Sequence, residues 1–180
     1  MEDYGGDKHM RVNFMQKRRL ALVGGLATAC LLGSVDTPFA ATTTTTFTVS
    51  VTLAATCTIN SASTLNFGNQ GILSTNVDQT STIQVTCTNS TPYNIGLDAG
   101  TGTGATVATR KLTSGGATVN YSLYSDSGRT TVWGNTIGTN TVTGTGNGAG
   151  QNYTVYGRIP SQTTPAPGTY TDTITVTVTY

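Results

Sequence analysis

The sequence contains few side chains capable of acid–base chemistry. Charged residues make up 9% of the 180 residues, and the single histidine is His9. Glutamate occurs once, at Glu2, so the chain beyond residue 40 lacks two of the commonest general bases. The aspartates beyond that point are scattered, and no G-x-S-x-G motif supplies an activated serine. These absences argue against an enzyme.

Charge is also too sparse and too balanced to draw an anionic partner. Beyond residue 40, four aspartates stand against four basic residues, which are Arg110, Lys111, Arg129 and Arg158. Without a basic field or an amphipathic segment, we expect no nucleic-acid partner and no direct membrane anchoring. The glycine-rich stretches GTGTGA and GTGNGAG lack the lysine of a phosphate-binding loop, so no cofactor is expected.

The one long apolar run is too short to span a bilayer. It covers residues 20–32, follows the basic residues Lys17, Arg18 and Arg19, and precedes the small-residue stretch TPFAAT. A basic flank, a short apolar run and a small-residue exit are typical of a secretory signal peptide. We therefore predict a signal peptide over residues 1–40, cleaved after Ala40.

Only two cysteines, Cys57 and Cys87, remain beyond that predicted cleavage site. An even number of cysteines in an exported chain indicates a disulfide, here closing a loop of about thirty residues. No C-x-x-C motif and no histidine accompany them, so a metal site is not expected.

Helical periodicity is missing beyond residue 40, and alternation of apolar and polar residues replaces it. Short alternating segments such as STIQVTC, VNYSLYSD and NYTVYGRI are separated by clusters of glycine, serine and asparagine. Threonine, which is β-branched and favours strands, is abundant. Many short strands, one disulfide and no helix predict a single all-β domain, an immunoglobulin-like β-sandwich.

Both ends of this domain carry an alternating segment. Phe47, Val49, Val51 and Leu53 alternate with polar residues near the start, and Ile174, Val176, Val178 and Tyr180 alternate with threonines at the end. A sandwich that lacks its final strand would leave a groove beside the last segment, which the first segment of another molecule could fill. The first segment could equally pair within its own chain and complete a monomer, and alternation alone does not separate the two.

The aromatic segment YSLYSDSGRTTVW also has two interpretations. Tyr121 and Leu123 alternate towards one face, and Asp126 and Arg129 bracket a tight turn. The favoured interpretation is a hairpin whose aromatic residues fill the core, and the alternative is a sugar-binding surface.

The order of several motifs resembles the spore coat protein U family. These are LNFG, a strand ending in VTC, YSLYSDSGRTTVWGN, YTVYGRIP and the closing GTYTDTITVTVTY, and the likeness covers essentially all of residues 41–180. The best-understood members of that family are subunits of archaic chaperone–usher pili. The resemblance implies an incomplete immunoglobulin-like sandwich that lacks its last strand, which a neighbouring subunit supplies.

The resemblance also implies roles for particular residues and partners. Residues 41–55 would form an N-terminal donor-strand extension and residues 56–180 the pilin domain, with Cys57–Cys87 as the disulfide of the family. The donor residues would be Phe47, Val49, Val51 and Leu53, and the acceptor edge would comprise Ile174, Val176, Val178 and Tyr180. Implied partners are related subunits, a periplasmic chaperone and an outer-membrane usher, with export to the periplasm and then to a surface pilus that supports attachment and biofilm formation. A monomeric lectin-like binding module and a coat or matrix protein are the alternatives.

Overall fold

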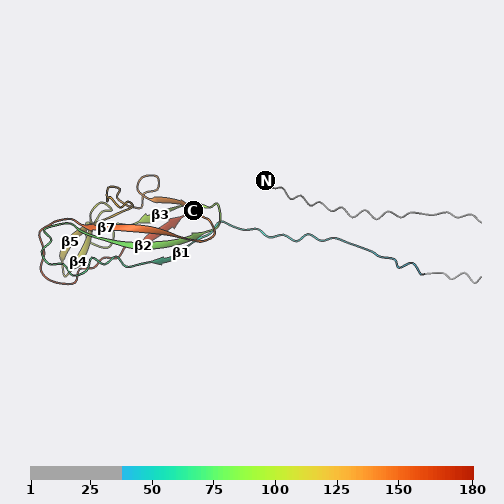
Figure 1. Cartoon of the computed structure of the whole chain (residues 1–180), viewed down its shortest axis with the longest axis horizontal. Coiled ribbons are helices and arrows are strands. Elements are labelled where there is room, and N and C mark those ends of the chain that lie inside the picture. Colours follow the sequence, from blue (N-terminus) through green and yellow to red (C-terminus); the bar gives the residue numbers. More distant parts are fainter. Residues whose placement is uncertain (1–37) are drawn as a thin grey trace, which may run out of the picture. The chain divides into compact units, whose positions relative to one another are not determined.

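The structure, a computed structural model, describes residues 38–180. The predicted signal peptide therefore lies almost entirely outside the described residues, and its cleavage after Ala40 stays a prediction. The described part of the chain contains β-strands and no α-helix, so the predicted all-β class is confirmed (Figure 1). The strands are β1 (Cys57–Ala62), β2 (Val77–Cys87), β3 (Pro92–Leu97), β4 (Arg110–Ser114), β5 (Ala117–Tyr124), β6 (Val142–Thr145), β7 (Gly150–Ile159) and β8 (Val176–Thr179).

The strands form two sheets of an immunoglobulin-like sandwich. One sheet has the order β1-β2-β7-β5-β4 and the other has the order β6-β3-β8. All neighbouring strands pair antiparallel. The two longest strands, β2 and β7, lie side by side through the middle of the larger sheet (Figure 1).

Alternation in the sequence places the core between the sheets. Along β2, Ile83, Val85 and Cys87 are buried, while Gln84 and Thr86 between them are less buried. This is the pattern of a strand with one face on the core and one towards solvent. Burial of each large apolar side chain stabilises the fold by about 1.5–3 kcal/mol relative to exposure.

Local turn chemistry accounts for the hairpin between β4 and β5. Ser114 pairs with Ala117, so Gly115 and Gly116 form a two-residue connection, and both have positive φ, 53° and 94°. Two positive φ angles are the requirement of a type I′ turn, which glycine meets without steric cost.

A buried arginine links the two sheets. Arg110 in β4 has no exposed surface, and its guanidinium donates hydrogen bonds to the backbone carbonyls of Leu97, Asp98, Val107 and Trp133 at 2.8–3.1 Å. Burial lowers the pKa of Arg110, and the nearby Tyr121, Asp98 and Asp172 act in the opposite direction. Because its donors are satisfied by carbonyl oxygens, the charge is held without a carboxylate in direct contact.

Candidate strand-binding groove

The last strand leaves one side of its sheet open. β8 pairs with β3 and stands at the end of the order β6-β3-β8. Within residues 38–180, no strand pairs with its other side. β1 stands likewise at the end of the larger sheet and is a neighbour of β8. The two sheets are therefore open along the same side of the sandwich, with backbone donors and acceptors free to pair with an added strand.

A groove of about 300 Å³ reaches the core from this open side. Its walls come from both sheets and from the segment that follows β1. Most of the lining is apolar: Leu65, Phe67, Ile83, Leu97, Leu112, Tyr121, Leu123, Val155, Ile174 and Val176. A volume of this size admits a few large side chains, so the groove is an opening in the core that apolar residues of another segment can fill.

The structure brings three of the four predicted acceptor residues to the inner side of the last strand. Ile174 and Val176 line the groove, and Val178 is partly buried against the same core. The Tyr180 side chain is 59% exposed. It lines a separate hollow together with Pro92 and Thr179.

The groove has a polar end that was not predicted from the sequence. Asp172 lies on the same inward side as Ile174, and it lines the groove together with Tyr121. The Tyr121 hydroxyl donates to Asp172 Oδ2 at 2.8 Å, while Asp172 Oδ1 accepts hydrogen bonds from Thr101 N, Thr101 Oγ1 and Thr173 N. Burial and this carboxylate raise the pKa of Tyr121. The signal was present in the sequence, because the alternation of TDTITVTVTY extends back to Asp172.

The predicted donor residues are exposed. Phe47, Val49, Val51 and Leu53 are 81–87% exposed, in a segment that forms no strand in the structure. Four large apolar side chains at every second position make a contiguous apolar stripe on an extended segment. Soluble monomers rarely expose such a stripe unless a partner covers it.

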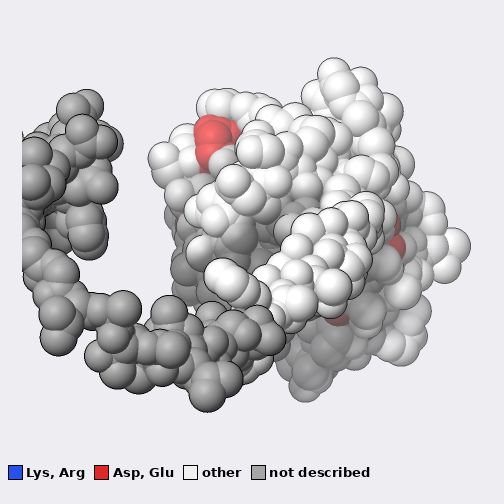
Figure 2. All heavy atoms as spheres, turned by 90° about the vertical axis from the view of Figure 1, so that its right-hand side faces the viewer, with Lys and Arg blue, Asp and Glu red and all other residues white. Residues whose placement is uncertain are grey.

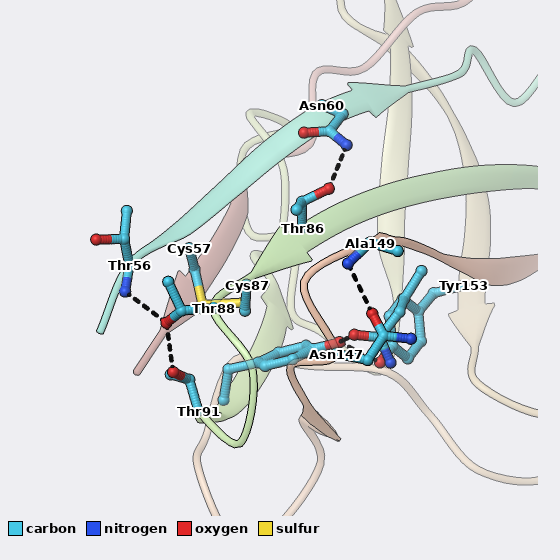
Figure 3. Close-up of a disulfide and its surroundings, with 12 residues drawn as sticks. Thr56, Cys57, Asn60, Thr86, Cys87, Thr88, Thr91, Asn147, Ala149 and Tyr153 are labelled. Carbon is cyan, nitrogen blue, oxygen red and sulfur yellow. Dashed lines mark hydrogen bonds between the residues drawn. A yellow bond between two sulfur atoms is a disulfide. The ribbon is translucent and has the colours of Figure 1, made fainter. Parts of the chain in front are cut away.

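A disulfide fixes the point at which this segment joins the sandwich. Cys57, the first residue of β1, is bonded to Cys87, the last residue of β2, which confirms the predicted disulfide (Figure 3). Thr56 N donates to Thr88 Oγ1 at 3.1 Å, and Thr88 N donates to Thr56 O at 2.9 Å. The chain is thus held at residues 56 and 57, directly after the exposed segment.

The aromatic segment is part of the core. Tyr121, Leu123 and Trp133 are all buried, and Trp133 Nε1 donates to the carbonyl of Ile95 at 2.8 Å. The hairpin interpretation is therefore confirmed. This argues against a sugar-binding surface built on Trp133, because a buried indole ring cannot stack on a sugar ligand. Asp126 and Arg129 do bracket a tight turn, in which Arg129 N donates to Asp126 O.

Charge is scarce on the surface as well. Figure 2 shows a face of the molecule with no lysine or arginine in view and only small acidic patches. Among the described residues, no group of three or more potential metal ligands occurs, and no helix is long and apolar enough to cross a membrane.

The described residues thus form an all-β domain with one disulfide, an open sheet edge and an exposed apolar segment. The chain matches the family described as Spore Coat Protein U domain over residues 43–177, and it belongs to that family. Among curated proteins, no sequence matches it significantly.

A similar solved structure is the CsuC–CsuE chaperone–tip adhesion subunit pre-assembly complex from archaic chaperone–usher Csu pili of Acinetobacter baumannii. The identity is 25% and the TM-score is 0.53, and the match covers 72% of this chain and 40% of that chain. This chain therefore spans about two fifths of the length of that relative.

Proposed function

We propose that this protein is a structural subunit of a chaperone–usher surface pilus and polymerises by donor-strand complementation. Phe47, Val49, Val51 and Leu53 of one copy fill the groove beside β8 of the next copy. The observation that carries the proposal is the presence on one chain of an exposed alternating segment and an open apolar groove. Because each copy has both, the contact is head-to-tail and extends into a filament.

The interaction is large enough to hold subunits together. Burial of four large apolar side chains contributes on the order of 6–12 kcal/mol gross, at about 1.5–3 kcal/mol each. Backbone pairing along the free side of β8 adds to this, and ordering of the extended segment offsets part of it.

The proposal also assigns a role to each part of the chain and names the partners of assembly. Residues 1–40 direct export, residues 41–55 form the donor extension, and residues 56–180 form the pilin domain. A periplasmic chaperone covers the groove before assembly, and an outer-membrane usher exchanges the chaperone for a donor segment. The family membership and the chaperone complex named in the similar structure support these partners. The filament lies outside the cell and supports attachment and biofilm formation.

The proposal is tested by the gel mobility of assembled material, with and without boiling in SDS. We expect wild-type chains to give a ladder of multimers that collapses to a monomer band on boiling. Val51→Asp places a charge in the apolar groove of the neighbour and should abolish the ladder, because burial of an unpaired carboxylate is strongly unfavourable. The chaperone complex of this variant should persist, because its own groove is unchanged.

Thr52→Asp is the matched control. Residue 52 points to the other side of the donor strand, away from the groove, so this variant should polymerise as the wild type does. A wild-type monomer in every lane, or a normal ladder from Val51→Asp, would contradict donor-strand assembly.

A further inference from the structure

We infer that Asp172 and Tyr121 form a polar end wall that sets the register of the incoming strand, and that Ala55 of the donor is the residue that meets this wall. The occupant is a second copy of this chain, so the inference rests on the proposed function. It adds a specificity determinant at the end of the groove, where the apolar lining stops.

The end wall is held rigidly. The Asp172 carboxylate accepts one hydrogen bond from the Tyr121 hydroxyl and three from Thr101 and Thr173. It also packs against the backbone of Gly100, where a Cβ atom would collide with it and where φ is +79°. A carboxylate fixed by four hydrogen bonds cannot turn away without leaving donors unsatisfied. It therefore stays at the groove as a polar group.

Alternation restricts how a donor strand can lie beside this wall. The inward residues of the acceptor are Asp172, Ile174, Val176 and Val178. Every strand pair within residues 38–180 is antiparallel, and we infer the same direction for the added strand. The apolar donor residues must face the groove, so the register can change only in steps of two residues.

One register satisfies both the apolar and the polar parts of the groove. It places Leu53 opposite Ile174 and Val51 opposite Val176. Ala55 then lies opposite Asp172, where a methyl side chain leaves the carboxylate and its hydrogen bonds undisturbed.

The two neighbouring registers each create a mismatch. A slide of one step towards the wall places Leu53 against the Asp172 carboxylate. A slide in the other direction places Cys57 at the wall, although its disulfide and Thr56 are already part of the donor's own sandwich. The wall and the disulfide thus limit the donor from opposite sides.

The first test compares two enlargements of adjacent alanines in the full-length chain. Ala55→Leu brings a large apolar side chain against the carboxylate and should reduce the yield of heat-sensitive multimers about tenfold or more. Ala54→Leu adds the same volume on the opposite side of the strand and should leave the yield unchanged. Residues 54 and 55 are both exposed in their own subunit, so neither change disturbs its fold.

Disulfide trapping between introduced cysteines tests which donor residue lies opposite which acceptor residue. Opposite residues in paired strands have Cβ atoms close enough for a disulfide, whereas residues one step away do not. The pair Val51→Cys with Val176→Cys should link neighbouring subunits, and the pair Val49→Cys with Val176→Cys should not.

Either of two results overturns the inference. A link through the Val49→Cys pair would show a donor strand that has slid one step towards the wall, and normal polymerisation of Ala55→Leu would show that the wall does not limit the donor. Absence of multimers from the wild type would instead overturn the proposed function, and the register inference with it.

Discussion

Arg110 is a buried charge whose partners are backbone carbonyls. Its guanidinium reaches from β4 to the carbonyls of Trp133 and of Leu97 at the end of β3, so it joins the two sheets; Leu97 is also part of the groove lining. A buried cation is unfavourable unless its donors are hydrogen-bonded, and here four of the five guanidinium N–H groups donate to carbonyl oxygens. The side chain therefore contributes to the shape of the core as well as to its stability.

Replacement of Arg110 should destabilise the domain strongly. In Arg110→Met, the buried carbonyls lose their donors, and we expect the free energy of unfolding to fall by about 3–5 kcal/mol. Denaturant unfolding of the purified variant measures this loss. Lys111→Met is the control, because the Lys111 ammonium makes an exposed hydrogen bond to Thr103 O and its removal should change stability by less than about 1 kcal/mol. Equal stabilities of the two variants would contradict a structural role for Arg110.

At the scale of elements, β1 depends on its attachment to β2. It is an edge strand whose residues after Cys57 are exposed, and its register with β2 shifts between Ile59 and Ser61. A side-chain hydrogen bond from Asn60 to Thr86 adds to the pairing (Figure 3), and Asn60 also donates to Gln84. Few apolar contacts hold β1 in place, so the disulfide at its first residue carries much of that task.

Removal of the disulfide should therefore lower stability and loosen β1. For a sequence separation of 30 residues, the chain-entropy estimate is about 3.5 kcal/mol. We expect the Cys57→Ser, Cys87→Ser double variant to lose about this much in denaturant unfolding, and to lose amide-exchange protection first in β1. Protection in β1 equal to that of the wild type would show that backbone pairing alone holds the strand.

The sequence predicted elements with strict alternation better than elements rich in glycine. The segments that became β2, β5 and β7 alternate clearly, and their inward residues are those expected. β6 is not recognisable from the sequence, because Gly144 and its threonine neighbours show no apolar pattern. Conversely, the family motif LNFG at residues 65–68 forms no strand, although Phe67 is buried.

The groove was predictable only in part, for a physical reason. Alternation identified Ile174, Val176 and Val178, because it reports which residues share a side of one strand. The opposite wall, which includes Leu65 and Tyr121, comes from residues distant in sequence. Their approach depends on the packing of two sheets, which a periodic pattern within one segment does not encode.

At the scale of the whole molecule, the small number of charges determines how stability depends on pH. Three of the four aspartates in residues 38–180 have lowered pKa values. The hydrogen bond from Arg158 lowers the pKa of Asp78, and the backbone N–H of Thr131 lowers that of Asp126. For Asp98, burial raises the pKa, but hydrogen bonds from Thr175 and Gly100 and the charge of Arg110 outweigh it.

These shifts predict a domain that is insensitive to pH until strongly acidic conditions. A carboxylate with a lowered pKa in the folded state stabilises the fold above its unfolded pKa of about 4, and this contribution is lost as pH falls through the folded value. Because the only histidine is His9, outside the described residues, no step is expected near about pH 6. The urea midpoint should be constant between about pH 8 and about pH 5 and should fall below about pH 4.

Asp78→Asn should lower the urea midpoint at neutral pH and reduce the acid-dependent fall, because Arg158 loses its ionised partner. A loss of stability centred near about pH 6, or an acid-dependent fall in Asp78→Asn as large as in the wild type, would show that other groups control it.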